Sequence, residues 1–138
     1  MWRNPSLDAQ YGETALNTYR TLLSIFPTSP LVPRAQQEID RLLDWYAQKN
    51  FNAGMQYFRR KAYESSIIYF SDVVAKYPKT PTAREAMLRL AQAYRAINYR
   101  EDALETCATL YRVYPADRRV RGVCGPPPVA TRDTAAKP

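Results

Sequence analysis

The chain has 138 residues, of which 46% are hydrophobic and 24% charged, a size and composition typical of one soluble globular domain. No apolar run approaches the roughly 18 residues of a membrane-spanning helix. The residues after Met1 contain no apolar stretch of the kind that marks a secretory signal. There is no histidine, the commonest general base and metal ligand, and no glycine-rich phosphate loop. We therefore predict a protein that is not an enzyme and uses no cofactor or metal.

The net charge of +7 is distributed unevenly. From Arg118 onward the chain holds five basic side chains and one acid, whereas the preceding 117 residues hold 15 basic and 12 acidic ones. A nearly balanced body without a basic stripe argues against nucleic-acid binding. The basic tail leaves one alternative class open, a binder of nucleic acid or an anionic surface, whose affinity would fall steeply with added salt.

Amphipathic helices are the predicted elements throughout the chain. Apolar residues spaced by three or four positions from Tyr11 to Phe26 predict a first helix that ends at Pro27. Nothing forces a break between Arg34 and Arg60, so this stretch predicts one long helix or two nearly coaxial ones. A turn at residues 60–62 then leads into a third helix.

The start of the fourth predicted helix has two possible caps. Thr80 precedes Pro81, which suits the first helical position. Thr82 and Glu85 have the spacing of a capping box. A turn at residues 98–99 then leads into a fifth helix.

The C-terminal segment after about Val123 is predicted to be a disordered, dispensable tail, because its proline-rich and small residues bury too little surface. The two cysteines do not form a CxxC pair. Cys107 is interpreted as a small buried residue and Cys124 as a loose tail thiol, and a disulfide between them requires the tail to fold back.

A fixed spacing recurs three times along the chain. Pro27, Pro78 and Pro115 each follow an aromatic residue, and the residue twelve positions earlier is small each time. This recurrence marks a helical repeat and is similar to the tetratricopeptide pattern, in which small residues let two helices approach and proline ends the unit. The predicted repeat-packing residues are Ala15, Tyr19, Pro27, Gly54, Tyr57, Ser66, Phe70, Pro78, Ala91, Tyr94, Ala103, Cys107 and Pro115.

The repeat predicts an all-α fold, a right-handed α-solenoid of tetratricopeptide-like helical hairpins over residues 1–122. A half repeat occupies about 8–30, and two further repeats occupy 31–79 and 80–117. Residues 123–138 form the predicted tail.

Several phrases occur in one order: Phe26-Pro27-x-Ser29-Pro30, Asp40-x-Leu42-Leu43-Asp44, Tyr57-Phe58-x-Arg60-x-Ala62-Tyr63 and Tyr77-Pro78-x-Thr80. From about Asp8 to Pro115 the chain resembles the C-terminal half of the BamD family of outer-membrane assembly lipoproteins. The resemblance implies a lipoprotein on the periplasmic face of the outer membrane, whose C-terminal repeats dock on POTRA domains of BamA.

This chain departs from that family in two respects. The acylated cysteine and the first repeats of the family have no counterpart here, so membrane attachment would require a lipid anchor outside this chain. Lys61 stands where the family usually has glycine, and a residue other than glycine is tolerable there but can shift the turn.

Arg59, Arg60 and Lys61 form a basic cluster at a predicted turn. They are interpreted either as cations at the negative end of a helix dipole or as a contact for an acidic patch of the partner. The resemblance carries the second role to Arg60, whose planar fork suits a carboxylate.

Three aromatic side chains are predicted to be exposed, and two carboxylates are predicted to be solvated. Tyr63 and Tyr99 are candidate interface anchors, with Trp45 as a further exposed aromatic. Asp40 and Asp44, on one helix face, are interpreted as solvated helix charges. The leading hypothesis is a scaffold that binds a BamA-type POTRA domain or other assembly subunits. The alternative hypothesis, which stays open, is another envelope adaptor of the type that coordinates cell-wall synthesis with division.

Overall fold

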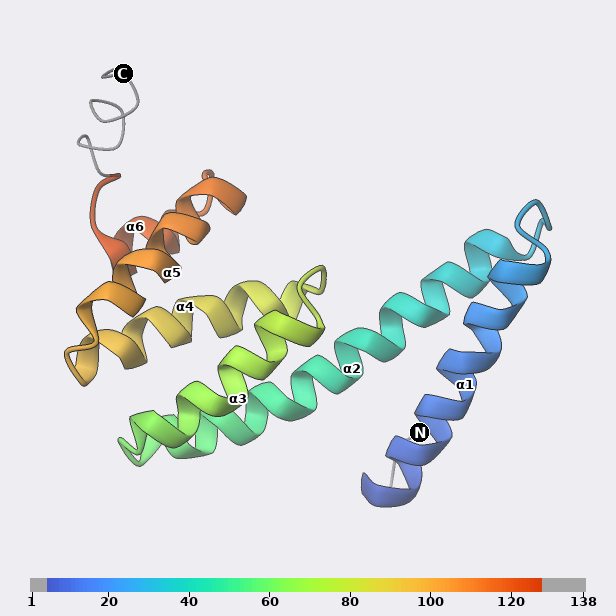
Figure 1. Cartoon of the computed structure of the whole chain (residues 1–138), viewed down its shortest axis with the longest axis horizontal. Helices are drawn as coiled ribbons and strands as arrows, with labels where there is room; N and C mark the ends of the chain where they lie inside the picture. Colours follow the sequence, from blue (N-terminus) through green and yellow to red (C-terminus); the bar gives the residue numbers. More distant parts are fainter. Residues whose placement is uncertain (1–4, 128–138) are drawn as a thin grey trace.

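The computed structural model describes the backbone of residues 5–127 and the side chains from residue 12 onward. The described chain forms six α-helices joined by short turns (Figure 1). The predicted all-α fold of stacked helical hairpins is confirmed, because consecutive helices pack against each other from α1 to α5. The long predicted helix is a single one. The helices are α1 (Pro5–Ile25), α2 (Val32–Arg59), α3 (Tyr63–Lys76), α4 (Pro81–Ala96), α5 (Arg100–Val113) and α6 (Arg118–Cys124). None of these helices is both long enough and apolar enough to cross a membrane.

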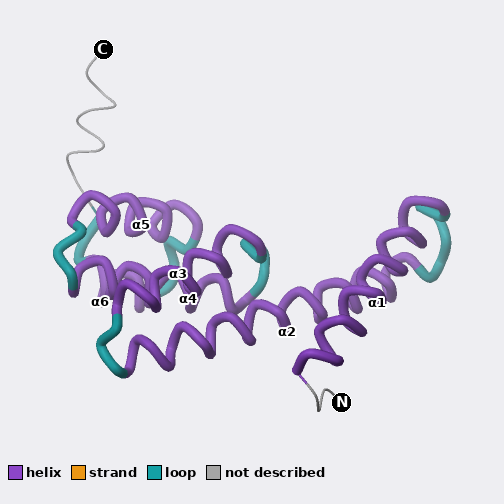
Figure 2. The backbone as a smooth tube through the Cα atoms, turned by 60° about the horizontal axis from the view of Figure 1, so that its bottom comes forward, coloured by secondary structure: helices purple, strands orange, loops and turns teal. Residues whose placement is uncertain are grey.

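Helix α2 joins two packed regions of the molecule. Its N-terminal half packs on α1, where Ile39 and Leu42 are buried with Leu16. Its C-terminal half packs on α3 and α4, and Figure 2 shows α3 to α6 gathered at that end while α1 folds back along the other. The α2–α3 and α4–α5 hairpins fall within the predicted ranges 31–79 and 80–117.

Small residues lie where the helices approach most closely. Gly54 of α2 faces Phe70 of α3, and a Cβ added at Gly54 would lie 2.7 Å from Cε1 of that ring. Ser66 and Ala91 are fully buried, and Ala103 is 6% exposed. The contact between Gly54 and Phe70 therefore fixes the separation of the α2–α3 hairpin.

Of the other predicted repeat-packing residues, Cys107 is buried in the core of α4 to α6, and several more lie at the edges of the interfaces or at helix ends. Ala15 and Tyr19 are half-buried on α1, and Tyr57 stacks on Tyr69 with ring centroids 5.6 Å apart. Pro27, Pro78 and Pro115 are exposed in the turns after α1, α3 and α5.

The start of α4 uses the first of the two predicted caps. The Thr80 hydroxyl accepts a hydrogen bond from the Ala83 N–H, and Pro81 takes the first helical position. Thr82 has a different role, because its hydroxyl donates to Oδ1 of Asp44 on α2 at 2.8 Å. The interpretation of Asp44 as a solvated charge is therefore wrong, since its carboxylate ties α2 to α4. Asp40 is exposed.

The C-terminal helix α6 corrects the predicted tail. Cys124 is joined to Cys107 of α5 by a disulfide, so it is not a loose thiol. Val120 of α6 is 1% exposed and packs on the core between α4 and α5. The folded region therefore includes residues 123 and 124, whereas the part of the predicted tail at 128–138 lies outside the described residues.

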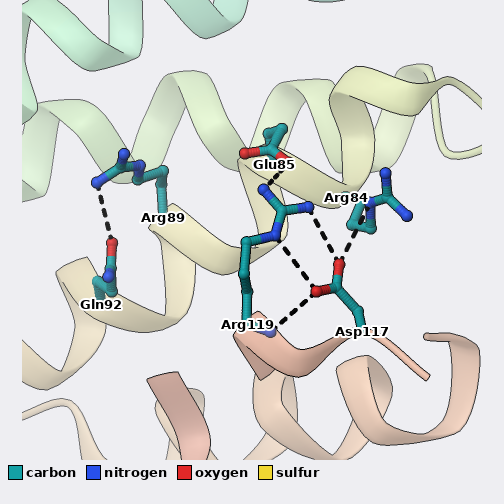
Figure 3. Close-up of polar contacts among 6 residues, drawn as sticks. All are labelled: Arg84, Glu85, Arg89, Gln92, Asp117 and Arg119. Atoms are coloured by element: carbon teal, nitrogen blue, oxygen red, sulfur yellow. Dashed lines mark hydrogen bonds and ion pairs between the residues drawn. The ribbon is translucent and has the colours of Figure 1, made fainter. Parts of the chain in front are cut away.

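Ion pairs also fasten α6 to α4 (Figure 3). Asp117 caps α6 by accepting from the Arg119 N–H at 2.9 Å, and its Oδ2 lies 3.5 Å from Nε of Arg84. Arg119 pairs in turn with Glu85. Hydrogen bonds from Arg119 hold the pKa of the Asp117 carboxyl below its usual value, so the charged form of this cap is favoured. The tail folds back because burial, charge pairing and a covalent bond act together.

Candidate partner-binding surface

The basic cluster lies in a well-defined turn at the C-terminal end of α2. The Ala62 N–H donates to the Tyr57 carbonyl at 2.9 Å, and the Lys61 N–H donates to the Phe58 carbonyl at 3.0 Å. Lys61 has a φ of 61°. This pair of bonds around a left-handed residue is a Schellman motif, which satisfies the last carbonyls of the helix. The turn therefore keeps the geometry that glycine favours, although lysine occupies it.

The end of α4 repeats the same motif. The Tyr99 N–H donates to the Tyr94 carbonyl at 2.9 Å, and Asn98 has a φ of 62°. Tyr99 also stacks on Tyr94, with ring centroids 6.2 Å apart. A contact between these two positions commonly accompanies the motif. Figures 1 and 2 show both turns on the same side of the helical stack.

The three basic side chains at the first turn are exposed and make no ion pair with the side chains described for residues 12–127. Arg59 lies in the last turn of α2, where the helix dipole favours a cation. Arg60 and Lys61 follow it directly. The structure thus brings three uncompensated positive charges together at a fixed turn. Both predicted interpretations, the dipole and an acidic partner, are compatible with this placement.

The predicted aromatic anchors differ in exposure. Tyr63 is half-buried and meets Phe58 edge-on, with ring centroids 5.4 Å apart. Tyr99 is 47% exposed. Trp45 is half-buried rather than exposed, and the Lys49 ammonium lies over its ring at 5.9 Å. Tyr63 adjoins the basic cluster, and Tyr99 belongs to the neighbouring turn on the same side.

Sequence reasoning missed two features of this part of the molecule. The tie between Asp44 and Thr82 joins residues 38 positions apart, and no local pattern indicates such a contact. The left-handed conformation of Lys61 could not be predicted, because lysine rarely adopts a positive φ. The only sequence signal for it was the glycine expected at that position from the resemblance.

Replacing Lys61 with glycine should raise the free energy of unfolding by about 1 kcal/mol, because glycine adopts a positive φ without the steric penalty of a Cβ. Urea unfolding followed by circular dichroism measures the gain. Lys61→Ala is the matched control: it removes the same charge but keeps the Cβ, so it should give no gain. Equal stabilisation by both variants would show that charge repulsion, not backbone strain, is relieved.

These sequentially packed hairpins define a tetratricopeptide-like repeat protein, a class that offers surfaces for binding. Residues 1–116 match the family described as "YfiO: Outer membrane lipoprotein", and the chain belongs to this family. The match ends just before α6, so this helix and Cys124 lie beyond the matched region.

Individual relatives agree with the family assignment. The chain is 29% identical over 111 residues to the outer membrane protein assembly factor BamD of Caulobacter vibrioides, and the aligned region covers 80% of this chain and 36% of that protein. It is 26% identical over 87 residues to the protein of the same name from Xylella fastidiosa, covering 63% of this chain and 30% of that protein. The chain thus spans about a third of the length of these curated relatives.

Proposed function

We propose that this chain acts as a BamD-type assembly factor, without enzymatic activity, and docks a BamA-type POTRA domain through the basic turn of Arg59, Arg60 and Lys61. The observation that carries the proposal is the cluster of three exposed, unpaired cations on a fixed turn in a chain of this family. An arginine of this turn can donate two parallel hydrogen bonds to a carboxylate of the partner. Tyr63 and Tyr99 add aromatic surface on the same side.

The disulfide supports a periplasmic location for the proposed function. Disulfides persist in oxidising compartments, which include the bacterial periplasm, and are rare in the cytosol. The Cys107–Cys124 bond closes the last packed unit of the chain. A place on the periplasmic face of the outer membrane is therefore consistent with both the chemistry of the chain and the description of its family. The family match favours this function over the alternative envelope adaptor.

The charge-reversal variant Arg60→Glu tests the docking surface. We expect it to weaken binding to a purified POTRA fragment of BamA by roughly tenfold or more, because reversing one member of an interfacial charge pair leaves two like charges in contact. Isothermal titration calorimetry measures the affinity. The melting temperature should change little, since Arg60 is exposed.

Arg112→Glu is the matched control, because Arg112 is also an exposed arginine at the C-terminal end of a helix, α5. Its affinity for the POTRA fragment should match that of the wild type. If both variants lose affinity equally, and the loss vanishes at high salt, general attraction to anions explains binding and the proposed docking site is wrong. An unchanged affinity of Arg60→Glu would contradict the site directly.

A further inference from the structure

One position of the repeat is buried in the first unit, half-buried in the second and open in the last. Leu16, Ile67 and Leu104 each follow the small residue of their unit, Ala15, Ser66 and Ala103. Leu16 of α1 is 8% exposed, because α2 covers it. Ile67 of α3 packs on a core cluster that includes residues of α4. Leu104 of α5, by contrast, is 71% exposed.

Helix α6 is too short to cover this position. It has seven residues, and its buried Val120 reaches only the part of α5 that holds Cys107 and Leu110. The uncovered part of α5 lines an open hollow of about 500 Å³ together with the end of α4 and Cys124. In the two preceding units a long helix covers the corresponding face, α2 over α1 and α4 over α3. The hollow is thus the part of the stacking face of α5 that none of the described helices covers.

The charges around the hollow are positive. Arg95 and Arg100 line it, and no carboxylate lies among its lining residues. Arg95 uses one N–H group on the Val123 carbonyl and keeps its other donors. Arg100 is exposed at the start of α5 and makes no ion pair within the described residues. A ligand in the hollow would therefore meet an apolar floor at Ala103 and Leu104 with guanidinium groups beside it.

We propose that this hollow receives an amphipathic helix of a partner protein, with its apolar face on Leu104 and acidic residues beside Arg95 and Arg100. A helix is the occupant because the same face is covered by a helix in each preceding unit. An acidic one is chosen because of the unopposed arginines. The chain's own residues 128–138 do not fit, since they carry two basic side chains and one acid. The lining of the hollow includes none of the three cations of the basic turn, so the inference does not rest on POTRA docking, although Tyr99 lies between Asn98 and Arg100 at its edge.

The test uses a designed, dye-labelled helix of about five turns, with a leucine stripe flanked by glutamates, and a second helix with lysines in their place. Fluorescence anisotropy measures binding to the oxidised full chain. We expect the acidic helix to bind more tightly than the basic one. Leu104→Gln should weaken its binding roughly tenfold, the loss expected when a buried leucine contact is removed. Arg100→Glu should weaken it by a similar factor.

Ile68→Gln is the matched control, because Ile68 lies on α3 outside the hollow and is 68% exposed. It should leave the affinity unchanged. The proposal is overturned if the acidic helix does not bind, if Ile68→Gln weakens binding as much as Leu104→Gln, or if the basic helix binds equally well. It is also overturned if the acidic helix binds only after residues 128–138 are deleted, because the chain's own tail would then be the occupant. Circular dichroism melting checks that each variant is folded.

Discussion

Replacing Phe70 with alanine should lower the free energy of unfolding by about 3–5 kcal/mol, the largest loss we expect from any single substitution in this chain. The Phe70 side chain of α3 is fully buried against α2. Its ring lies 5.5 Å from that of Phe51 and 6.1 Å from that of Phe58, measured between centroids. Alanine removes these contacts and leaves a cavity, and Gly54 opposite has no side chain to fill it.

Urea unfolding of wild type and variant measures the loss, and a difference under about 1 kcal/mol would contradict the central place given to Phe70 in this core. Gly54→Ala examines the same contact from the other side. Its Cβ would meet the ring at 2.7 Å, and such overpacking costs about 1–3 kcal/mol. The higher helix propensity of alanine offsets only about 1 kcal/mol of this.

The two substitutions should couple strongly in a double-mutant cycle. Once Phe70 is alanine, the two ring atoms nearest to a Cβ at residue 54 are gone and only Tyr69 Cβ remains close, at 3.1 Å, so Gly54→Ala should lose most of its cost. Gly122→Ala in α6 is the control, because a Cβ there meets nothing within 4 Å. If Gly54→Ala and Gly122→Ala have the same effect, the close approach of α2 and α3 at Gly54 is not real.

The helices and their pairing could be predicted because the information is local. Helical periodicity and the prolines after α1, α3 and α5 set the elements, and the recurrence of small residues twelve positions before each proline set which faces meet. Phe70 lies four residues after the small residue of its unit, Ser66, and Gly54 was predicted from the similarity to the tetratricopeptide pattern. The basic cluster at residues 59–61 was also visible in the sequence, since it depends on three consecutive residues.

The ties between distant residues could not be predicted. Asp44 reads as a surface charge on a helix, and only the approach of α4 turns it into an acceptor for Thr82. In the sequence, residues 118–124 look like a basic segment that leads into a proline-rich tail. A segment of seven residues is too short to form a stable helix on its own. Its structure depends on Val120 entering the core and on the pairing of Asp117 with Arg84 and Arg119. The sequence therefore predicted a tail, because its composition is visible in the sequence and these contacts are not.

The disulfide should make the second large contribution to stability. Cys107 and Cys124 are 17 positions apart, and a cross-link that closes a loop of this size stabilises a protein by about 3 kcal/mol, largely by restricting the unfolded chain. We expect Cys124→Ser to lower the free energy of unfolding by about that amount under oxidising conditions. The hydrogen bond from Arg95 to the Val123 carbonyl and the buried Val120 should keep α6 in place before unfolding.

Urea unfolding with and without dithiothreitol separates the disulfide from the side chain. Reduction should destabilise the wild type by nearly as much as Cys124→Ser does, and it should leave that variant unchanged. A thiol titration of the denatured wild type should find no reactive cysteine before reduction and both cysteines after it. Equal urea midpoints for the oxidised wild type and Cys124→Ser would mean that the bond adds nothing to the fold. α6 would then be held by Val120, by the ion pairs of Asp117 with Arg84 and of Arg119 with Glu85, and by the hydrogen bond from Arg95.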